Sequence, residues 1–154
     1  MSKNTGLTLI EILIAISIII VISSLALMSL SSFRSQQVLK STTVDIMSIL
    51  NKAKQNTLSS LNSTNYGVHF ESGRVTLFVG PTYSQGIGTN EVTVFDQAVE
   101  IPTVGGINVG GGSDVVFERL TGETLGGTIV VQLKSNTSKQ KTITINKTGI
   151  ISSN

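Results

Sequence analysis

A single carboxylate, Glu11, stands near the start of an otherwise apolar segment, and its chemistry needs an explanation. Residues 12–33 carry no charge. As a helix they would extend about 33 Å at about 1.5 Å per residue, enough to cross a hydrocarbon core about 30 Å thick. A charged side chain in that core costs about 2.5–3.5 kcal/mol on insertion scales. Since an anchor needs no carboxylate, Glu11 is predicted to have a partner.

Three ordinary explanations compete for this segment. A secretory signal peptide has a shorter apolar region of about 7–15 residues and a small-residue cleavage site, which this run lacks. A plain membrane anchor fits the length but leaves Glu11 unexplained. A capping box is the third explanation, because Thr8-Leu9-Ile10-Glu11 has the Thr-x-x-Glu pattern whose side chains bind free amides at a helix start. The residues alone leave the anchor and the capping box open.

The run Gly6-Leu7-Thr8-Leu9-Ile10-Glu11, after a short polar leader, resembles the type III signal of type IV pilins and type II secretion pseudopilins. The resemblance implies that a prepilin peptidase cleaves between Gly6 and Leu7 and that the Leu7 amine is methylated. It divides the chain into a leader (1–6), a transmembrane and filament-core helix (7–33) and an exported domain (34–154). The chain departs from the family in having Leu7 where Phe is most common and a single basic residue, Lys3, in the leader.

The resemblance also implies a partner for Glu11. Cleavage creates a positive α-amine at Leu7, and an acid and an amine attract strongly in a low dielectric, where either is costly to leave alone. In the family, the Glu of an incoming subunit meets the terminal amine of a subunit already in the filament. Thr8 and Glu11 are therefore predicted to be assembly residues.

A second helical pattern, over residues 34–61, is amphipathic. Apolar residues recur on one face while polar and charged residues take the others. The stripe is formed by Leu39, Ile46, Leu50, Ala53 and Leu61. Neither Pro nor Gly occurs between Leu7 and Leu61, so the two segments are predicted to form one helix, whose second half packs on the domain's own sheet.

Residues 66–154 change to a period of two with β-branched residues, which indicates strands. The expected strands cover 66–70, 75–79, 91–95, 99–101, 115–117, 128–134 and 142–146, with a last edge at 150–151. A turn is expected at 135–140, and Gly-rich loops at 80–89 and 105–112. Short strands with polar turns favour an antiparallel sheet. The fold class is therefore α+β, with a long N-terminal helix packed on an antiparallel sheet.

The β region is similar to the GspH/FimT-type minor pseudopilins and minor pilins. The shared features are Tyr66-Gly67-Val68, Val116-Phe117 followed by Thr121-Gly122, and a late hairpin that ends in Lys147-Thr148-Gly149-Ile150-Ile151.

No catalytic, cofactor or metal site is predicted. His69 is the single histidine and lies in an expected strand, where a hydrogen-bonded structural role is the ordinary case. The Gly-rich run 105–112 lacks the Gly-Lys-Ser/Thr end of a phosphate loop. The acids Asp96, Glu100, Asp114 and Glu118 match no calcium loop. With 11 Lys and Arg against 9 Asp and Glu, the chain also lacks the broad basic surface of a nucleic-acid-binding protein.

The expected function is that of a structural minor subunit of a secretion pseudopilus or pilus-like filament. Its implied partners are other pilins or pseudopilins, the prepilin peptidase, an inner-membrane assembly platform with its ATPase, and membrane lipid before assembly. The implied location is the bacterial inner membrane, with the domain outside the cytoplasm, and then a periplasmic or extracellular filament. Two alternatives remain: a membrane-tethered binding module that never assembles, and a DNA-binding minor pilin that uses the lysines of the last hairpin, Lys134, Lys139, Lys141 and Lys147.

Overall fold

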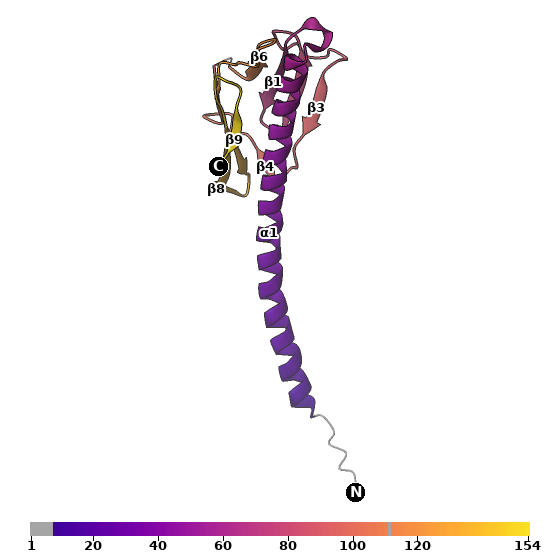
Figure 1. Cartoon of the computed structure of the whole chain (residues 1–154). Helices are drawn as coiled ribbons and strands as arrows, with labels where there is room; N and C mark the ends of the chain where they lie inside the picture. Colours follow the sequence, from indigo (N-terminus) through magenta and orange to yellow (C-terminus); the bar gives the residue numbers. More distant parts are fainter. Residues whose placement is uncertain (1–7, 111) are drawn as a thin grey trace. The chain divides into compact units, whose positions relative to one another are not determined.

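The computed structural model describes the backbone of residues 8–110 and 112–154, together with their side chains except those of residues 25–31. The chain divides into two compact units, Met1–Ser35 and Gln36–Asn154. One continuous helix, α1 (Leu9–Leu58), contributes to both units (Figure 1). The predicted single helix is thus confirmed between these bounds, whereas its expected start at Leu7 lies outside the described residues.

The first unit exposes its apolar side chains. Every large apolar residue that is described between Leu9 and Ile22 is exposed, from 46% at Ile12 to 79% at Leu9. Two serines of the same helical segment, Ser17 and Ser24, donate their hydroxyls to the carbonyls of Leu13 and Val21, which satisfies these hydroxyls within the helix.

The membrane span predicted over residues 7–33 is not confirmed. Among the residues described, no helix provides a stretch that is both long enough and apolar enough to cross a membrane.

The second half of α1 packs against the domain through the predicted stripe. Leu39, Ile46, Leu50 and Ala53 are buried, and buried threonines at 42, 43 and 57 complete the face. The prediction for Leu61 was wrong: its side chain is 47% exposed, because α1 ends at Leu58. Ser60 adopts a left-handed conformation with φ 51°, and a short 3₁₀ helix, η1 (Leu61–Ser63), follows.

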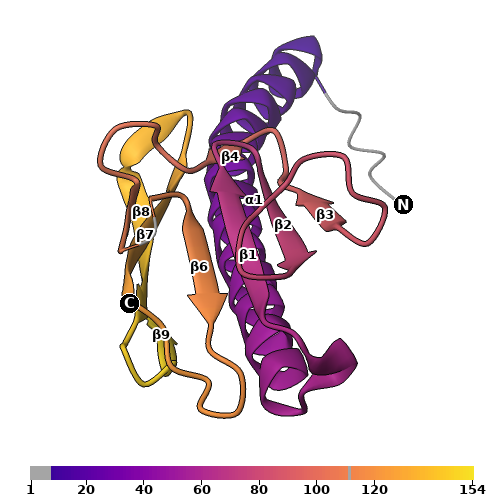
Figure 2. The same cartoon turned by 90° about the horizontal axis from the view of Figure 1, so that it is seen from above.

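In the described residues, nine strands form two antiparallel sheets. Their bounds are β1 Tyr66–Glu71, β2 Arg74–Val79, β3 Glu91–Val94, β4 Val99–Glu100, β5 Ile107–Val109, β6 Asp114–Phe117, β7 Gly127–Leu133, β8 Asn136–Ile145 and β9 Ile151–Ser153. The first sheet has the order β3-β2-β1-β6, and the second has β4-β7-β8-β9, with β5 also paired to β7. Figure 2 shows β1 and β2 lying across α1, with β6 on the side of β7 and β8. The predicted α+β class and antiparallel pairing are confirmed.

Two predicted loops contain strand. Residues 107–109, expected to lie in a Gly-rich connection, form β5 against the start of β7, because the pattern Ile-Asn-Val alternates and can bury its apolar residues. The expected turn at 135–140 is shorter, since β8 already begins at Asn136. The register shifts between Gln132 and Leu133, and this irregularity absorbs the extra residues of β8.

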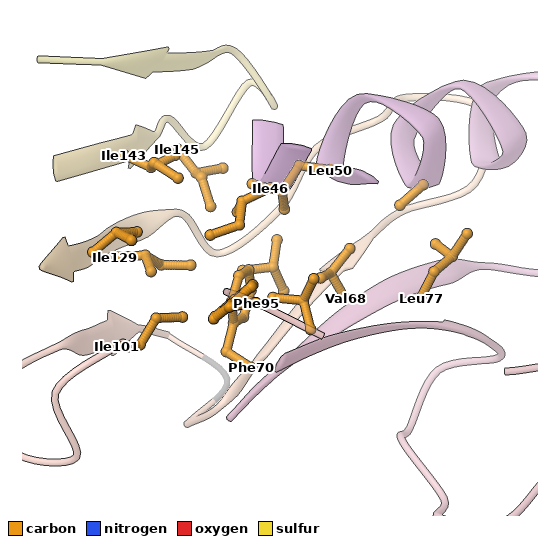
Figure 3. Packing of buried hydrophobic residues seen from close by; sticks show 14 of the residues in the cluster. Ile46, Leu50, Val68, Phe70, Leu77, Phe95, Ile101, Ile129, Ile143 and Ile145 are labelled. Atoms are coloured by element: carbon orange, nitrogen blue, oxygen red, sulfur yellow. The ribbon is translucent and has the colours of Figure 1, made fainter. Parts of the chain in front are cut away.

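A single apolar core lies between α1 and the two sheets. The buried side chains of Ile46 and Leu50 from the helix meet Val68 and Phe70 from the first sheet and isoleucines from the second (Figure 3). Both sheets contribute alternate residues to this core, because successive side chains of a strand point to opposite faces.

Candidate assembly site and polar clusters

The start of α1 is closed by a capping box formed by Thr8 and Glu11. The Thr8 hydroxyl accepts a hydrogen bond from the Glu11 amide at 3.3 Å, and the Glu11 carboxylate accepts one from the Thr8 amide at 3.5 Å. These two bonds satisfy amides that have no partner inside the helix. The capping role, one of the alternatives derived from the sequence, is therefore observed.

Capping leaves the charge of Glu11 uncompensated within the described residues. The hydrogen bond that its carboxylate accepts comes from the neutral Thr8 amide, and no ion pair to it is found in the part of the chain that the structure describes. The next charged residue along the helix is Arg34. Glu11 is thus an exposed carboxylate at the edge of an exposed apolar surface, where it remains able to pair with a cation of another molecule. Gly6 and Leu7 lie outside the described residues.

The four lysines suggested as a nucleic-acid contact do not form one group. Lys134 lies in the turn after β7, and Lys139 and Lys141 lie within β8. Lys147 follows the other end of β8, six residues beyond Lys141, which corresponds to about 20 Å of extended chain. All four are exposed. The hairpin therefore brings together three of these cations.

His69 lies on the face of the first sheet that is turned away from α1. Its Nδ1 is 2.5 Å from the Asp114 carboxylate on β6, and its ring stacks on Tyr83 with centroids 3.9 Å apart. Its Nε2 lies 3.8 Å from the carboxylate of Glu71. His69 thus has the hydrogen-bonded role predicted for it, but its partner Asp114 was missed, because the two residues are far apart in sequence.

Glu71, which lies near His69, also contacts Arg74. Its carboxylate accepts hydrogen bonds from Arg74 Nε at 2.8 Å and Nη2 at 2.9 Å. The hydrogen bond and the negative charge of Glu71 raise the pKa of Arg74 above its ordinary value.

Three of the four carboxylates considered for calcium have separate partners. Asp96 accepts the amide of Ala98, Glu100 accepts the side-chain amide of Gln132, and Asp114 faces His69. Among the described residues, no group of three or more His, Cys, Asp or Glu is placed to hold a metal ion.

Comparison with known families supports the resemblance at the chain's start. Residues 1–27 match the family model described as the prokaryotic N-terminal methylation motif. This motif marks prepilins of the type IV pilin and pseudopilin type, and its range includes Gly6, Leu7, Thr8 and Glu11. It supports a type IV pilin-like subunit that a prepilin peptidase processes. No curated protein and no solved structure matches the chain significantly.

Proposed function

We propose that this chain is a minor subunit of a type II secretion pseudopilus or a type IV pilus-like filament. A prepilin peptidase cleaves after Gly6, the amine of Leu7 is methylated, and the first half of α1 enters the filament core. Before assembly this segment is held in the inner membrane. The protein has a structural role, and the energy for assembly comes from a separate ATPase and membrane platform.

The observation that carries this proposal is the exposed apolar surface within the methylation motif, from Leu9 to Ile22. Isolated apolar residues on a surface are ordinary, but a continuous patch indicates contact with a lipid or protein partner. The described side chains from Leu9 to Ile22 find no burial in their own unit, and the second unit has a core of its own. Lipid before assembly, and neighbouring helices after it, provide the missing apolar surroundings.

The β domain supports a subunit of the GspH/FimT-type branch. Two segments of that resemblance, Thr121-Gly122 and Lys147–Ile151, meet in the fold. A Cβ at Gly149 would lie 2.2 Å from the Gly122 carbonyl oxygen, and Lys54 of α1 donates its Nζ to the Gly149 carbonyl at 2.9 Å. Glycine is therefore required at position 149 for the two segments to approach each other beside the helix.

N-terminal mass spectrometry of the protein extracted from membranes tests this function. In cells with an active prepilin peptidase, the mature chain is expected to begin at a methylated Leu7, and Gly6→Ala is expected to leave the precursor intact. Thr5→Ala is the matched control, because it changes the residue before Gly6 and should still be processed. A wild-type chain that keeps its original start would contradict the proposal.

A further inference from the structure

Strand β6 is an edge strand whose outward backbone groups have no partner among the described residues. It pairs with β1 alone. The Phe70 amide bonds to the Ser113 carbonyl at 2.9 Å, and Val68 opposes Val115 in the same register. Directly opposed residues of an antiparallel pair alternate between bonded and non-bonded positions. Val115 therefore bonds to β1, whereas Asp114 and Val116 direct their N–H and C=O groups away from it.

These outward groups face a preformed groove of about 790 Å³, which is within the range of ligand sites. Beside β6, the groove is lined by Pro81 and Thr82 after β2, and by residues 123–126 before β7. The second wall is held by backbone hydrogen bonds from Glu118 to Glu123 and from Thr124 to Lys147.

The chemistry of the groove identifies the kind of ligand. The outward N–H and C=O groups belong to Asp114 and Val116, which are two residues or about 6.6 Å of strand apart. This spacing matches the N–H and C=O groups on alternate residues of an extended peptide. Such an edge recognises a peptide by strand addition, in which main-chain hydrogen bonds supply affinity and side-chain pockets supply specificity. Val116 and the exposed Leu125 add apolar surface.

The charges favour a different polypeptide over a second β6. Asp114, Glu118 and Glu123 line the groove against one cation, Lys147. Pairing β6 with the same strand of another copy would bring acidic edges together, and like charges across strands are destabilising. We propose that the β6 groove binds an extended segment of another protein, in which uncharged residues are flanked by Lys or Arg. This proposal is independent of filament assembly.

The direct test measures binding of a fluorescent peptide, acetyl-Lys-Val-Thr-Val-Thr-Lys-amide, to the full chain in detergent by anisotropy. Val116→Pro removes an outward N–H, which an edge strand tolerates, and is expected to weaken binding about tenfold or more. Val94→Pro is the matched control. Its amide faces outward from β3, the opposite edge of the same sheet, and binding should be unchanged.

Two further measurements keep the test decisive if Val116→Pro impairs folding. A peptide methylated on alternate backbone nitrogens should lose binding to the wild-type chain, and Glu118→Gln with Glu123→Gln should weaken binding of the basic peptide. Absence of saturable binding up to about 1 mM, or equal binding of the methylated peptide, overturns the proposal. Self-association that Val116→Pro abolishes would assign the edge to a second copy and also overturn it.

Discussion

Replacing Glu11 by Gln separates the two roles of this residue. Gln has nearly the same shape and can take the second position of a capping box, so it should preserve the bond to the Thr8 amide while removing the charge. Ala removes both the bond and the charge. Comparing Glu11→Gln with Glu11→Ala therefore distinguishes a cap from an intermolecular charge pair, which a single substitution cannot do.

The two roles predict effects of different size. Loss of an N-terminal cap costs about 0.5–2 kcal/mol, and the lower end applies here because the two bonds of the box are long, 3.3 and 3.5 Å. Leaving a buried charge without its partner costs about 3–5 kcal/mol, which is a hundredfold or more at about 1.4 kcal/mol per factor of ten. If Glu11 pairs with a neighbour's amine, Gln should lose nearly as much assembly as Ala.

Filament incorporation is the quantity to measure. Sheared filaments are compared by immunoblotting, with helix content from circular dichroism and processing from N-terminal mass spectrometry as controls. We expect normal cleavage and helix content for Glu11→Gln but a severe loss of incorporation. Wild-type incorporation of the Gln variant, together with a loss of severalfold for Ala, would refute the charge-pair reasoning and leave capping as the function of Glu11.

Two more predictions concern the β domain. Gly67→Ala should lower the unfolding free energy by about 1–3 kcal/mol, because its Cβ would lie 2.4 Å from the Phe78 ring. Thermal unfolding measures this change. Gly73→Ala is the control, because its Cβ would meet nothing within 4 Å, so its stability should be unchanged or slightly raised. DNA binding by the full chain, measured by anisotropy, should be weak at physiological salt, with a log–log slope no steeper than about −2.7 for three phosphates, since the hairpin groups three of its lysines. The prediction of weak DNA binding would be contradicted by submicromolar binding at physiological salt that is lost when four lysines are replaced by Gln. These lysines are Lys134, Lys139, Lys141 and Lys147.

The helices and strands could be predicted wherever a periodic pattern of apolar residues extended over a long segment. The stripe through Leu39, Ile46 and Leu50 identified the buried face of α1, and the alternating residues of β1 and β2 identified a hairpin. The end of α1 could not be placed, because Leu61 continues the apolar pattern and a serine at position 60 does not by itself indicate a left-handed conformation. Thr57, one turn before Leu61, is the last buried residue of the helix.

The candidate sites divide in the same way. Thr8 and Glu11 are three residues apart, so the sequence itself revealed their pairing. The contact of His69 with Asp114 and the groove beside β6 depend on strand order, which a single sequence does not specify. The same holds for Lys147, whose separation from the other lysines follows from the length of β8.

The buried stripe of α1 has a mechanical consequence for a subunit held by the first half of that helix. A pull transmitted along α1 would act parallel to the stripe, so the contacts of Leu39, Ile46, Leu50 and Ala53 resist it together, in shear. At the far end the hydroxyl of Thr57 accepts the Tyr66 amide at 3.0 Å and donates to the Ala53 carbonyl at 2.9 Å. The junction between α1 and β1 is thereby tied by a side chain as well as by the chain itself. A domain joined in this way would yield under tension by releasing the whole helix face at once.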